Sequence, residues 1–222
     1  MKVRDAVAAR RSIREFRPDP VDDDLIRELL VGAARAPSGG NLQPWRIYVV
    51  NGKSLTRLRA FLATRPPVEE VEYDIYPPKL WEPYRSNRFE NGEQLYGSIG
   101  IPREDKAARA RQFARNDDFF GAPCALFCFV DRGMGRPQWS DLGMFLQTLM
   151  LLAVERGLAV HVGLDHSLTH PTGKFAPSLR VPKPCGGRVP AGALFGREVE
   201  GVVEHRALVA MSLDGGEVAA RT

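Results

Sequence analysis

The sequence predicts a mixed domain of helices and short buried strands. Segments with helical spacing of apolar residues alternate with two short β-rich runs, RIYVV at 46–50 and CALFCFV at 124–130. Of the 222 residues, 44% are hydrophobic and 26% are charged, an ordinary balance for a globular protein with a sizeable core. We therefore expect residues 1–222 to form a single domain.

The N-terminal third is predicted to contain three helices. Residues 3–9 form a short one that runs into a group of arginines. The second begins at Asp22, a suitable N-cap residue followed by further acids in the first turn, and Pro37 ends it. Its apolar face is marked, at helical spacing, by Leu25, Leu29 and Ala33. Residues 53–63 read as the third helix.

The second half of the chain contains a predicted central helix, QWSDLGMFLQTLMLLAVERG at 138–157. It is apolar on nearly all sides, which is typical of a buried helix, and Gly157 would stop it. Within it, Asp141 is interpreted as a cap or first-turn charge, and Gln147 as a residue that needs a buried partner. Residues 103–115 are expected to form a polar helix. Beyond Leu158 the periodicity is too weak to predict elements.

Composition restricts the class of protein. The net charge of +4 is mild, and suits an anionic ligand as well as a nucleic acid. No run of 18 apolar residues is present, so we expect no membrane span. The N-terminus MKVRDAVAARR lacks the apolar region of a secretion signal. Three cysteines without framework spacing fit a reducing cytoplasm, and Cys124 and Cys128 read as small core residues.

The stretch RRSIREF at 10–16 places three arginines within five residues of a serine. In an extended segment, alternate side chains point the same way, so Arg10, Ser12 and Arg14 would share one side. Two guanidinium groups around a hydroxyl suit a phosphate monoester, and Arg11 could join them. The alternative is a solvated basic turn. Nucleic-acid binding is disfavoured because basic and acidic residues are interleaved in the rest of the sequence, and no stripe of aromatic and basic residues occurs.

A second stretch, ARAPSGGNLQPWRIYVV at 34–50, leads from a predicted helix into a predicted strand. Its Ser-Gly-Gly sequence lets the backbone approach a ligand closely. The amides of Asn41 and Gln43 can donate and accept hydrogen bonds, which suits the edge of a heterocycle. The alternative is a glycine-rich turn, and for Trp45 we favour a place in the core.

Residues 66–100 change in character, being rich in proline and aromatic residues and poor in periodicity. Such a segment is typical of a lid over a binding site, or its rings could pack as a local core. Further on, His166 and His170 have the spacing of two metal ligands on one helical face. Pro171 interrupts that helix and no convincing acidic ligand follows, so we expect no metal site.

RRSIREF, followed some 25 residues later by APSGGNLQPW, resembles the nitroreductase family of flavin-dependent oxidoreductases. NDDFFGAPCALF and WSDLGMFLQTLMLLAVERGL are similar to that family's middle strand and central helix, and the segment 66–100 is similar to an active-site insertion of one subgroup. The resemblance covers about residues 5–160. It implies an α+β fold with a central, mostly antiparallel sheet flanked by helices.

The resemblance also implies a chemistry. FMN would bind non-covalently at a homodimer interface, take electrons from NADH or NADPH, and pass them to a nitroaromatic or quinone-like acceptor in a ping-pong mechanism. The flavin N5 carries the hydride, so no catalytic side chain is expected. Two alternatives remain: a flavin-fragmenting enzyme on the same scaffold, and a non-enzymatic binder of nucleic acid or acidic partners.

Residue by residue, the resemblance implies four groups of contacts. The FMN phosphate and ribityl chain would contact Arg10, Arg11, Ser12 and Arg14. The flavin ring would contact, from the second subunit, Pro37, Ser38, Gly39 and Asn41. A turn after the central helix and a late arginine would supply Gly163, Leu164 and Arg206. A wall for flat acceptors would consist of Tyr76, Trp81, Tyr84, Arg88 and Tyr96. From about residue 159 the chain departs from the family pattern, through divergence or a shifted reading frame.

Overall fold

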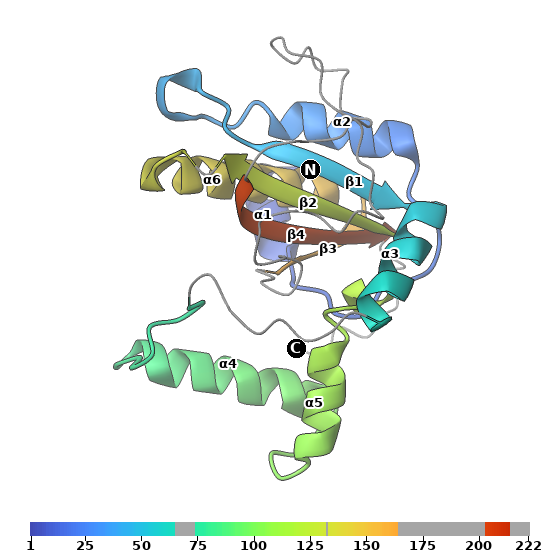
Figure 1. The fold of residues 1–222 in the computed structure, drawn as a ribbon, viewed down its shortest axis with the longest axis vertical. Coiled ribbons are helices and arrows are strands. Elements are labelled where there is room, and N and C mark those ends of the chain that lie inside the picture. Colours follow the sequence, from blue (N-terminus) through green and yellow to red (C-terminus); the bar gives the residue numbers. More distant parts are fainter. Residues whose placement is uncertain (65–73, 132, 164–202, 214–222) are drawn as a thin grey trace.

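The computed structural model describes residues 1–64, 74–131, 133–163 and 203–213. A four-stranded sheet forms its centre, in the order β1-β2-β4-β3, and each neighbouring pair of strands is antiparallel (Figure 1). The strands are β1 (Arg46–Asn51), β2 (Cys124–Asp131), β3 (Leu158–Gly163) and β4 (Val203–Leu213). The predicted α+β fold with a mostly antiparallel sheet is confirmed.

Strand β2 is buried on both faces, which explains its unbroken run of apolar residues. One set of alternate residues, Leu126, Cys128 and Val130, faces the larger core cluster. The other set, Ala125, Phe127 and Phe129, faces a second cluster on the opposite side of the sheet. Cys124 and Cys128 are both fully buried, as expected for core residues.

Helices cover both faces of the sheet. The larger cluster is formed with α2 (Asp23–Ala33) and α6 (Arg136–Glu155). Their apolar contributions come mainly from Ile26, Leu29, Leu30 and Ala33 on α2, and from Leu142, Phe145, Leu149 and Ala153 on α6. The second cluster is covered by α3 (Gly52–Thr64) through Leu55, Leu58 and Leu62. The short α1 (Val3–Ala9) packs against α6.

Two predicted helix ends are confirmed, and a third differs, because α2 ends at Ala33, before Pro37. The carboxylate of Asp22 accepts hydrogen bonds from the backbone N–H groups of Asp24 and Leu25 at 2.8 and 3.1 Å, so Asp22 is the N-cap of α2. Gly157 follows the C-cap of α6 with φ 69°, a left-handed conformation that glycine adopts readily.

The predictions for α6 were wrong in detail. The helix exposes one face, and Gln147 lies on it, so this residue does not need a buried partner. Asp141 is not a cap: it lies in the second turn and is only 4% exposed. The sequence pattern suggested a helix apolar all round because exposed glycine and methionine residues interrupt its polar side.

The segment expected to be irregular contains a regular helix, α4 (Tyr84–Ser98), which is followed by α5 (Lys106–Ala114). Neither helix has a buried residue, so the sequence carried no apolar stripe by which α4 could be recognised. Together they form an arm, which we define as residues 74–114, and its two helices lie apart from the sheet (Figure 1). Within the described ranges, no helix combines the length and apolar character of a membrane span.

The packing of α6 makes a prediction about stability. Leu149 is fully buried against the sheet, so Leu149→Ala should lower the free energy of unfolding by about 2–5 kcal/mol. Gln147→Ala, two residues away on the exposed face, should change it by less than about 0.5 kcal/mol. Urea unfolding of both variants checks this, and similar losses in the two would contradict the placement of α6.

Candidate functional site

The RRSIREF segment runs in an extended conformation along the outer edge of β3. The chain leaves α1 at Arg10 with φ −58° and ψ 125°. Ser12 forms a parallel bridge with Val160, where the N–H of Ile13 donates to the Val160 carbonyl at 3.1 Å. Farther along, the N–H of Phe16 donates to the carbonyl of Phe120 at 3.2 Å. The extended conformation on which the phosphate-binding interpretation depends is observed, and backbone hydrogen bonds hold it at two points.

The arginines of this segment differ in their partners. Within the described ranges, Arg10, Arg11 and Arg14 have no carboxylate partner: the guanidinium of Arg11 donates to the Ala8 carbonyl at 2.8 Å, and that of Arg14 makes only a long 3.5 Å contact with the Ser12 carbonyl. Arg17, in contrast, pairs with Asp19 at 2.7 Å. We call the uncompensated set Arg10, Arg11, Ser12 and Arg14 the socket. Its charges are available to an anion, whereas that of Arg17 is neutralised.

Arg14 is half-buried, as is Arg10, whereas Arg11 is exposed. Burial lowers the pKa of its guanidinium below the ordinary value, and the nearby Tyr96 acts in the opposite direction. A partly desolvated cation without a carboxylate gains more from an anionic ligand than a solvated one does. The socket is therefore better suited to binding one anion than to attracting anions nonspecifically, as an exposed basic surface would.

His161, in β3 next to the residue that pairs with Ser12, was not predicted from the sequence to have a role. The two histidines considered as metal ligands, His166 and His170, lie outside the described residues. The side chain of His161 is 6% exposed, and its ring lies edge-on to that of Phe120, 5.0 Å between centroids. Its Nδ1 has no hydrogen-bond partner in the part of the chain that the structure describes. Burial, together with the charge of Arg14, lowers the pKa of His161 to about 4, so the imidazole is neutral at pH 7.

The glycine-rich loop between α2 and β1 has an unusual backbone. Gly40, Asn41 and Gln43 all have left-handed φ angles, between 48° and 56°. The hydroxyl of Ser38 accepts from the N–H of Gln43 at 3.0 Å, which closes the loop on itself. A Cβ added at Gly40 would meet no atom within 4 Å. A flat ligand can therefore approach the backbone here, and the exposed amide of Asn41 lies beside that open space.

Asp141 connects this loop to α6. Its two carboxylate oxygens accept from the backbone N–H of Gly39 at 3.2 and 3.3 Å. The sequence did carry a signal for this burial, since Asp141 shares an i, i+4 face with Phe145 and Leu149. At the other end of the loop, Trp45 stacks on Phe145 with 5.0 Å between ring centroids, which confirms the core position favoured for this tryptophan.

The predicted contacts fall at opposite edges of the sheet. The socket lies along β3, one edge strand, and Gly163 ends that strand. The loop with Pro37, Ser38, Gly39 and Asn41 leads into β1, the other edge strand. Arg206 lies in β4, two positions from the partner of Gly163, but its side chain and Leu164 fall outside the described residues. Within one chain, the socket therefore lies near Gly163, whereas the loop lies at the opposite edge of the sheet.

The arm carries the aromatic residues predicted to contact an acceptor. Arg109 of α5 pairs with both oxygens of Glu93 on α4, at 2.7 and 3.2 Å, and its guanidinium lies 4.2 Å from the ring centroid of Tyr96. Tyr96 is near the C-terminal end of α4 and close enough to Arg14 to influence its pKa. The other predicted residues lie near the opposite end of α4, and all of them are exposed: Tyr76, Trp81, Tyr84 and Arg88.

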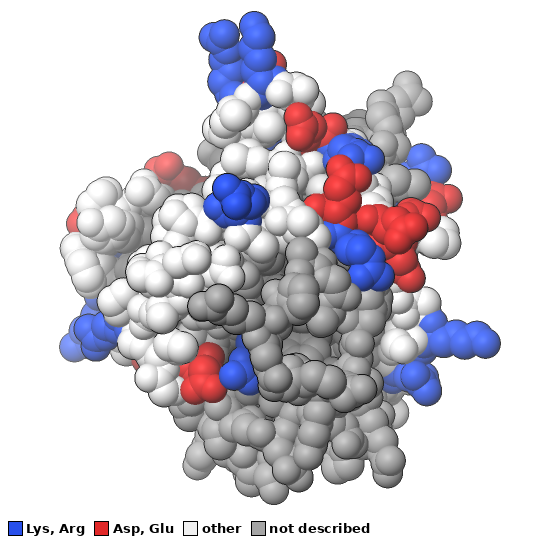
Figure 2. Space-filling model, turned by 90° about the horizontal axis from the view of Figure 1, so that it is seen from above, with Lys and Arg blue, Asp and Glu red and all other residues white. Residues whose placement is uncertain are grey.

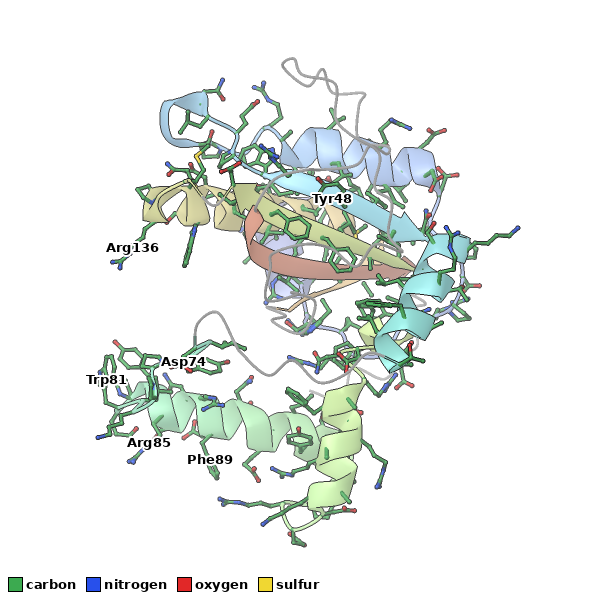
Figure 3. All side chains as sticks on the ribbon, in the orientation of Figure 1. Tyr48, Asp74, Trp81, Arg85, Phe89 and Arg136 are labelled. Atoms are coloured by element: carbon green, nitrogen blue, oxygen red, sulfur yellow. The ribbon has the colours of Figure 1, made fainter. Side chains whose placement is uncertain are left out.

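The N-terminal end of the arm presents rings and charges to solvent. Trp81 and Tyr84 meet edge-on at 5.4 Å, and the guanidinium of Arg88 lies over the ring of Tyr76 at 4.3 Å. Figure 3 shows Arg85 and Phe89 on the side of α4 that is turned away from the sheet. The structure therefore separates Tyr96, near the socket, from the remaining predicted acceptor contacts.

Surface charge on the face shown in Figure 2 is mixed, with acidic and basic side chains side by side. This pattern is unlike the continuous basic stripe by which proteins usually bind nucleic acids. The described residues also contain no group of three histidine, cysteine or acidic side chains that could hold a metal ion.

Comparisons with a family model and with known proteins both identify nitroreductases as similar to this chain. The model of the nitroreductase family matches residues 7–162. The 4-nitrobenzoate reductase of Pseudomonas putida is 40% identical over 156 residues, which are 69% of this chain and 68% of that protein. The nitrobenzene nitroreductase of Ectopseudomonas oleovorans is 38% identical over 173 residues, 75% of each chain.

A solved structure shows the same likeness in three dimensions. The FMN and NADPH-dependent nitroreductase NfnB from Sphigopyxis sp. strain HMH superimposes with a TM-score of 0.80 at 37% identity, covering 100% of this chain and 92% of that one. The match to the family model ends at residue 162, next to the end of β3. This is close to the point where the sequence itself departs from the family pattern.

The buried His161 predicts a dependence of stability on pH. Its pKa is lowered in the folded state, from 6.5 to about 4, so the unfolded chain binds the proton first as the pH falls through this window. Stability should therefore fall with decreasing pH, and His161 alone should contribute about 2 kcal/mol of loss between pH 7 and pH 5. Urea unfolding at both values, in the parent and in His161→Phe, measures this. An equal loss in the variant would show that another group is responsible.

Proposed function

Because the chain belongs to the nitroreductase family, we propose that it is an FMN-dependent oxidoreductase that uses NADH or NADPH to reduce nitroaromatic or quinone-like acceptors. The observation that carries the proposal is the socket, in which three arginines without carboxylate partners among the described residues lie within two positions of Ser12 in an extended segment. The relatives named above reduce 4-nitrobenzoate and nitrobenzene, and the similar solved structure is of an FMN and NADPH-dependent enzyme.

The residues present fit FMN. The guanidinium groups of Arg10, Arg11 and Arg14, with the Ser12 hydroxyl, supply charge-assisted donors for the phosphate and the ribityl chain. Gly163, at the end of β3 beside the socket, with Leu164 and Arg206 would contact the flavin. When bound, FMN supplies the hydride chemistry. The protein binds, orients and shields it, and no side chain of the chain need transfer the hydride.

A homodimer would complete this site. The loop with Pro37, Ser38, Gly39 and Asn41 lies at the opposite edge of the sheet from the socket, so one copy cannot place both around the same flavin. We propose that the loop of a second copy approaches the ring, with Gly40 allowing close approach because it has open space above it. Nicotinamide and acceptor would then take turns at one flavin face, which gives ping-pong kinetics.

The arm would act as a lid within this single domain of residues 1–222. Residues 66–100, of which the structure describes 74–100, include five exposed or half-buried side chains that would form the acceptor wall: Tyr76, Trp81, Tyr84, Arg88 and Tyr96. Such rings stack well on flat acceptors. An exposed aromatic surface of this kind is also typical of a segment that contacts another subunit.

Two neighbouring arginines on the arm differ in a way that bears on acceptor choice. Both Nε and Nη2 of Arg85 lie 2.6 Å from a carboxylate oxygen of Glu82. Arg88 stacks on Tyr76 and has no carboxylate partner in the described ranges. We infer that Arg88 holds the carboxylate of an anionic acceptor such as a nitrobenzoate, since the charge of Arg85 is already compensated.

The location we propose is the cytoplasm. Cys124 and Cys128 are free thiols in the buried strand β2, and burial raises the pKa of Cys124 to about 12 and that of Cys128 further. Thiols held protonated in a core are neither reactive nor paired, which is usual for proteins of a reducing compartment.

The visible spectrum of the purified protein tests the function. We expect a flavin spectrum, either as purified or after addition of FMN, and steady NADH or NADPH oxidation with 4-nitrobenzoate while FMN stays intact. A protein that binds no flavin would overturn the proposal. Consumption of FMN in the presence of oxygen would instead favour the flavin-fragmenting alternative.

The partners of Arg14 and Arg17 predict different effects on FMN binding. Arg14→Ala removes an uncompensated charge-assisted contact worth about 1.5–3 kcal/mol, so FMN affinity should fall about 10- to 100-fold at fixed salt. Arg17→Ala removes a charge already paired with Asp19 and should change affinity by less than about threefold. Fluorescence titration with FMN measures both, and equal losses would mean that the segment acts only through its overall charge.

The difference between Arg88 and Arg85 predicts which of them affects selectivity for the acceptor. Arg88→Ala should lower kcat/KM for 4-nitrobenzoate by about tenfold, through KM, and leave that for uncharged nitrobenzene nearly unchanged. The matched control Arg85→Ala, which removes a guanidinium already paired with Glu82, should leave both acceptors nearly unchanged. Equal effects of Arg88→Ala on charged and uncharged acceptors would exclude a role in carboxylate binding.

A further inference from the structure

We propose that Asp141 is a positioning residue, which holds the loop at residues 38–43 in the conformation that receives the flavin ring. The proposal rests on the proposed function for the identity of the ligand. The loop conformation itself follows from contacts within the described chain. The nitroreductase resemblance implied no role for this residue, and its position in the sequence indicated a helix cap or a first-turn charge.

Within the described ranges, the hydrogen bonds of the loop amides are internal to the loop, except for one that joins the loop to α6. The N–H of Asn41 donates to the Ser38 carbonyl at 2.9 Å, that of Leu42 to the Gly39 carbonyl at 3.1 Å, and that of Gln43 to the Ser38 hydroxyl at 3.0 Å. These bonds shape the loop without fixing where it lies. Among the described residues, the loop amide that is bonded to another element is that of Gly39, which donates to Asp141 at 3.2 and 3.3 Å.

Asp141 and Phe145 act together because they lie one helical turn apart on α6. Asp141 holds the start of the loop at Gly39, and Phe145 stacks on Trp45 just after its end. Between these two points, Gly40, Asn41 and Gln43 keep left-handed backbone angles, which glycine and asparagine adopt readily but which are unfavourable for glutamine. The hydrogen bonds within the loop shape this conformation, and α6 fixes the position of the loop at both ends.

A carboxylate is an expensive choice for this position. Asp141 is 4% exposed, and burying a carboxylate is unfavourable unless strong hydrogen bonds compensate. In the described part of the chain its partner is a single backbone N–H, with no cation paired to it. An apolar residue would fill the space with less desolvation. The presence of a carboxylate here is therefore explained by its hydrogen bond to Gly39, since a charged acceptor makes a stronger bond to an amide than a neutral one does.

Three variants test the inference. Asp141→Leu fills the space without an acceptor, Asp141→Asn keeps the shape and one acceptor oxygen, and Leu149→Ala is a destabilised control on the same face of α6. Hydrogen exchange of the peptide 37–43 reports the loop directly, without flavin. Titrations with FMN and with riboflavin report the binding of the ring, since riboflavin lacks the phosphate.

We expect Asp141→Leu to speed exchange in the loop and to weaken FMN and riboflavin by the same factor, about 10- to 100-fold. Asp141→Asn should change both measurements in the same direction by less. Leu149→Ala should lower the melting temperature and leave loop exchange and both affinities close to those of the parent. A common effect of Asp141→Leu and Leu149→Ala would overturn the inference, because it would reduce Asp141 to a general contributor to stability.

The proposed function and this inference fail in different ways. A parent protein that binds neither flavin overturns the function, while faster loop exchange in Asp141→Leu would still support the positioning of the loop. Unchanged exchange in Asp141→Leu overturns the inference alone, even where FMN binds. If Asp141→Leu does not fold, Asp141→Asn decides the question, since the weaker neutral acceptor must still raise loop exchange for the inference to hold.

Discussion

The burial of β2 on both faces is the constraint on which the rest of the structure depends. Because alternate residues of this strand enter two separate apolar clusters, each face of the sheet needs a layer of helices. The α2–α6 pair covers one face and α3 covers the other. A sheet closed on both faces offers backbone groups to a ligand or another segment only at its edges and strand ends. The two candidate contact regions lie there, at β3 and before β1.

The helix α6 connects these packing requirements to the proposed site. Its buried face supports the sheet through Leu149 and Ala153, while Asp141 and Phe145 on the same face hold the loop that precedes β1. The loop is therefore anchored, through Asp141 and Phe145, on the same helix face that supports the core. This coupling gives the glycine-rich loop a rigid support, which a binding loop needs if the backbone is to approach a flat ring at a fixed distance.

Local patterns predicted local features well and long-range ones poorly. Helical and β-rich runs located α1, α2, β1, α3, β2 and α6, whereas the position of the RRSIREF segment beside β3 was not predicted. The helix α4 was missed because it buries nothing, and β3 and β4 because their runs carry little periodicity. Asp141 was misread because its partner, Gly39, lies 102 residues earlier. Nor could the sequence show that Arg17 has a carboxylate partner and Arg14 has none among the described residues.

The described chain leaves three features open to a ligand or a second copy: the socket arginines, which have no carboxylate partner among the described residues, the open space at Gly40, and the exposed rings of the arm. The first and the third are unfavourable for an isolated chain, through partly desolvated charge and apolar surface in water, whereas the second leaves room for a ring to approach the backbone. An anionic flat cofactor would satisfy the first two together, provided that a second copy brings its loop to the socket. The same pairing could cover the rings. One assembly would thus account for all three features, and this agreement is the physical reason to prefer a dimeric flavoprotein over a binder that uses the basic segment alone.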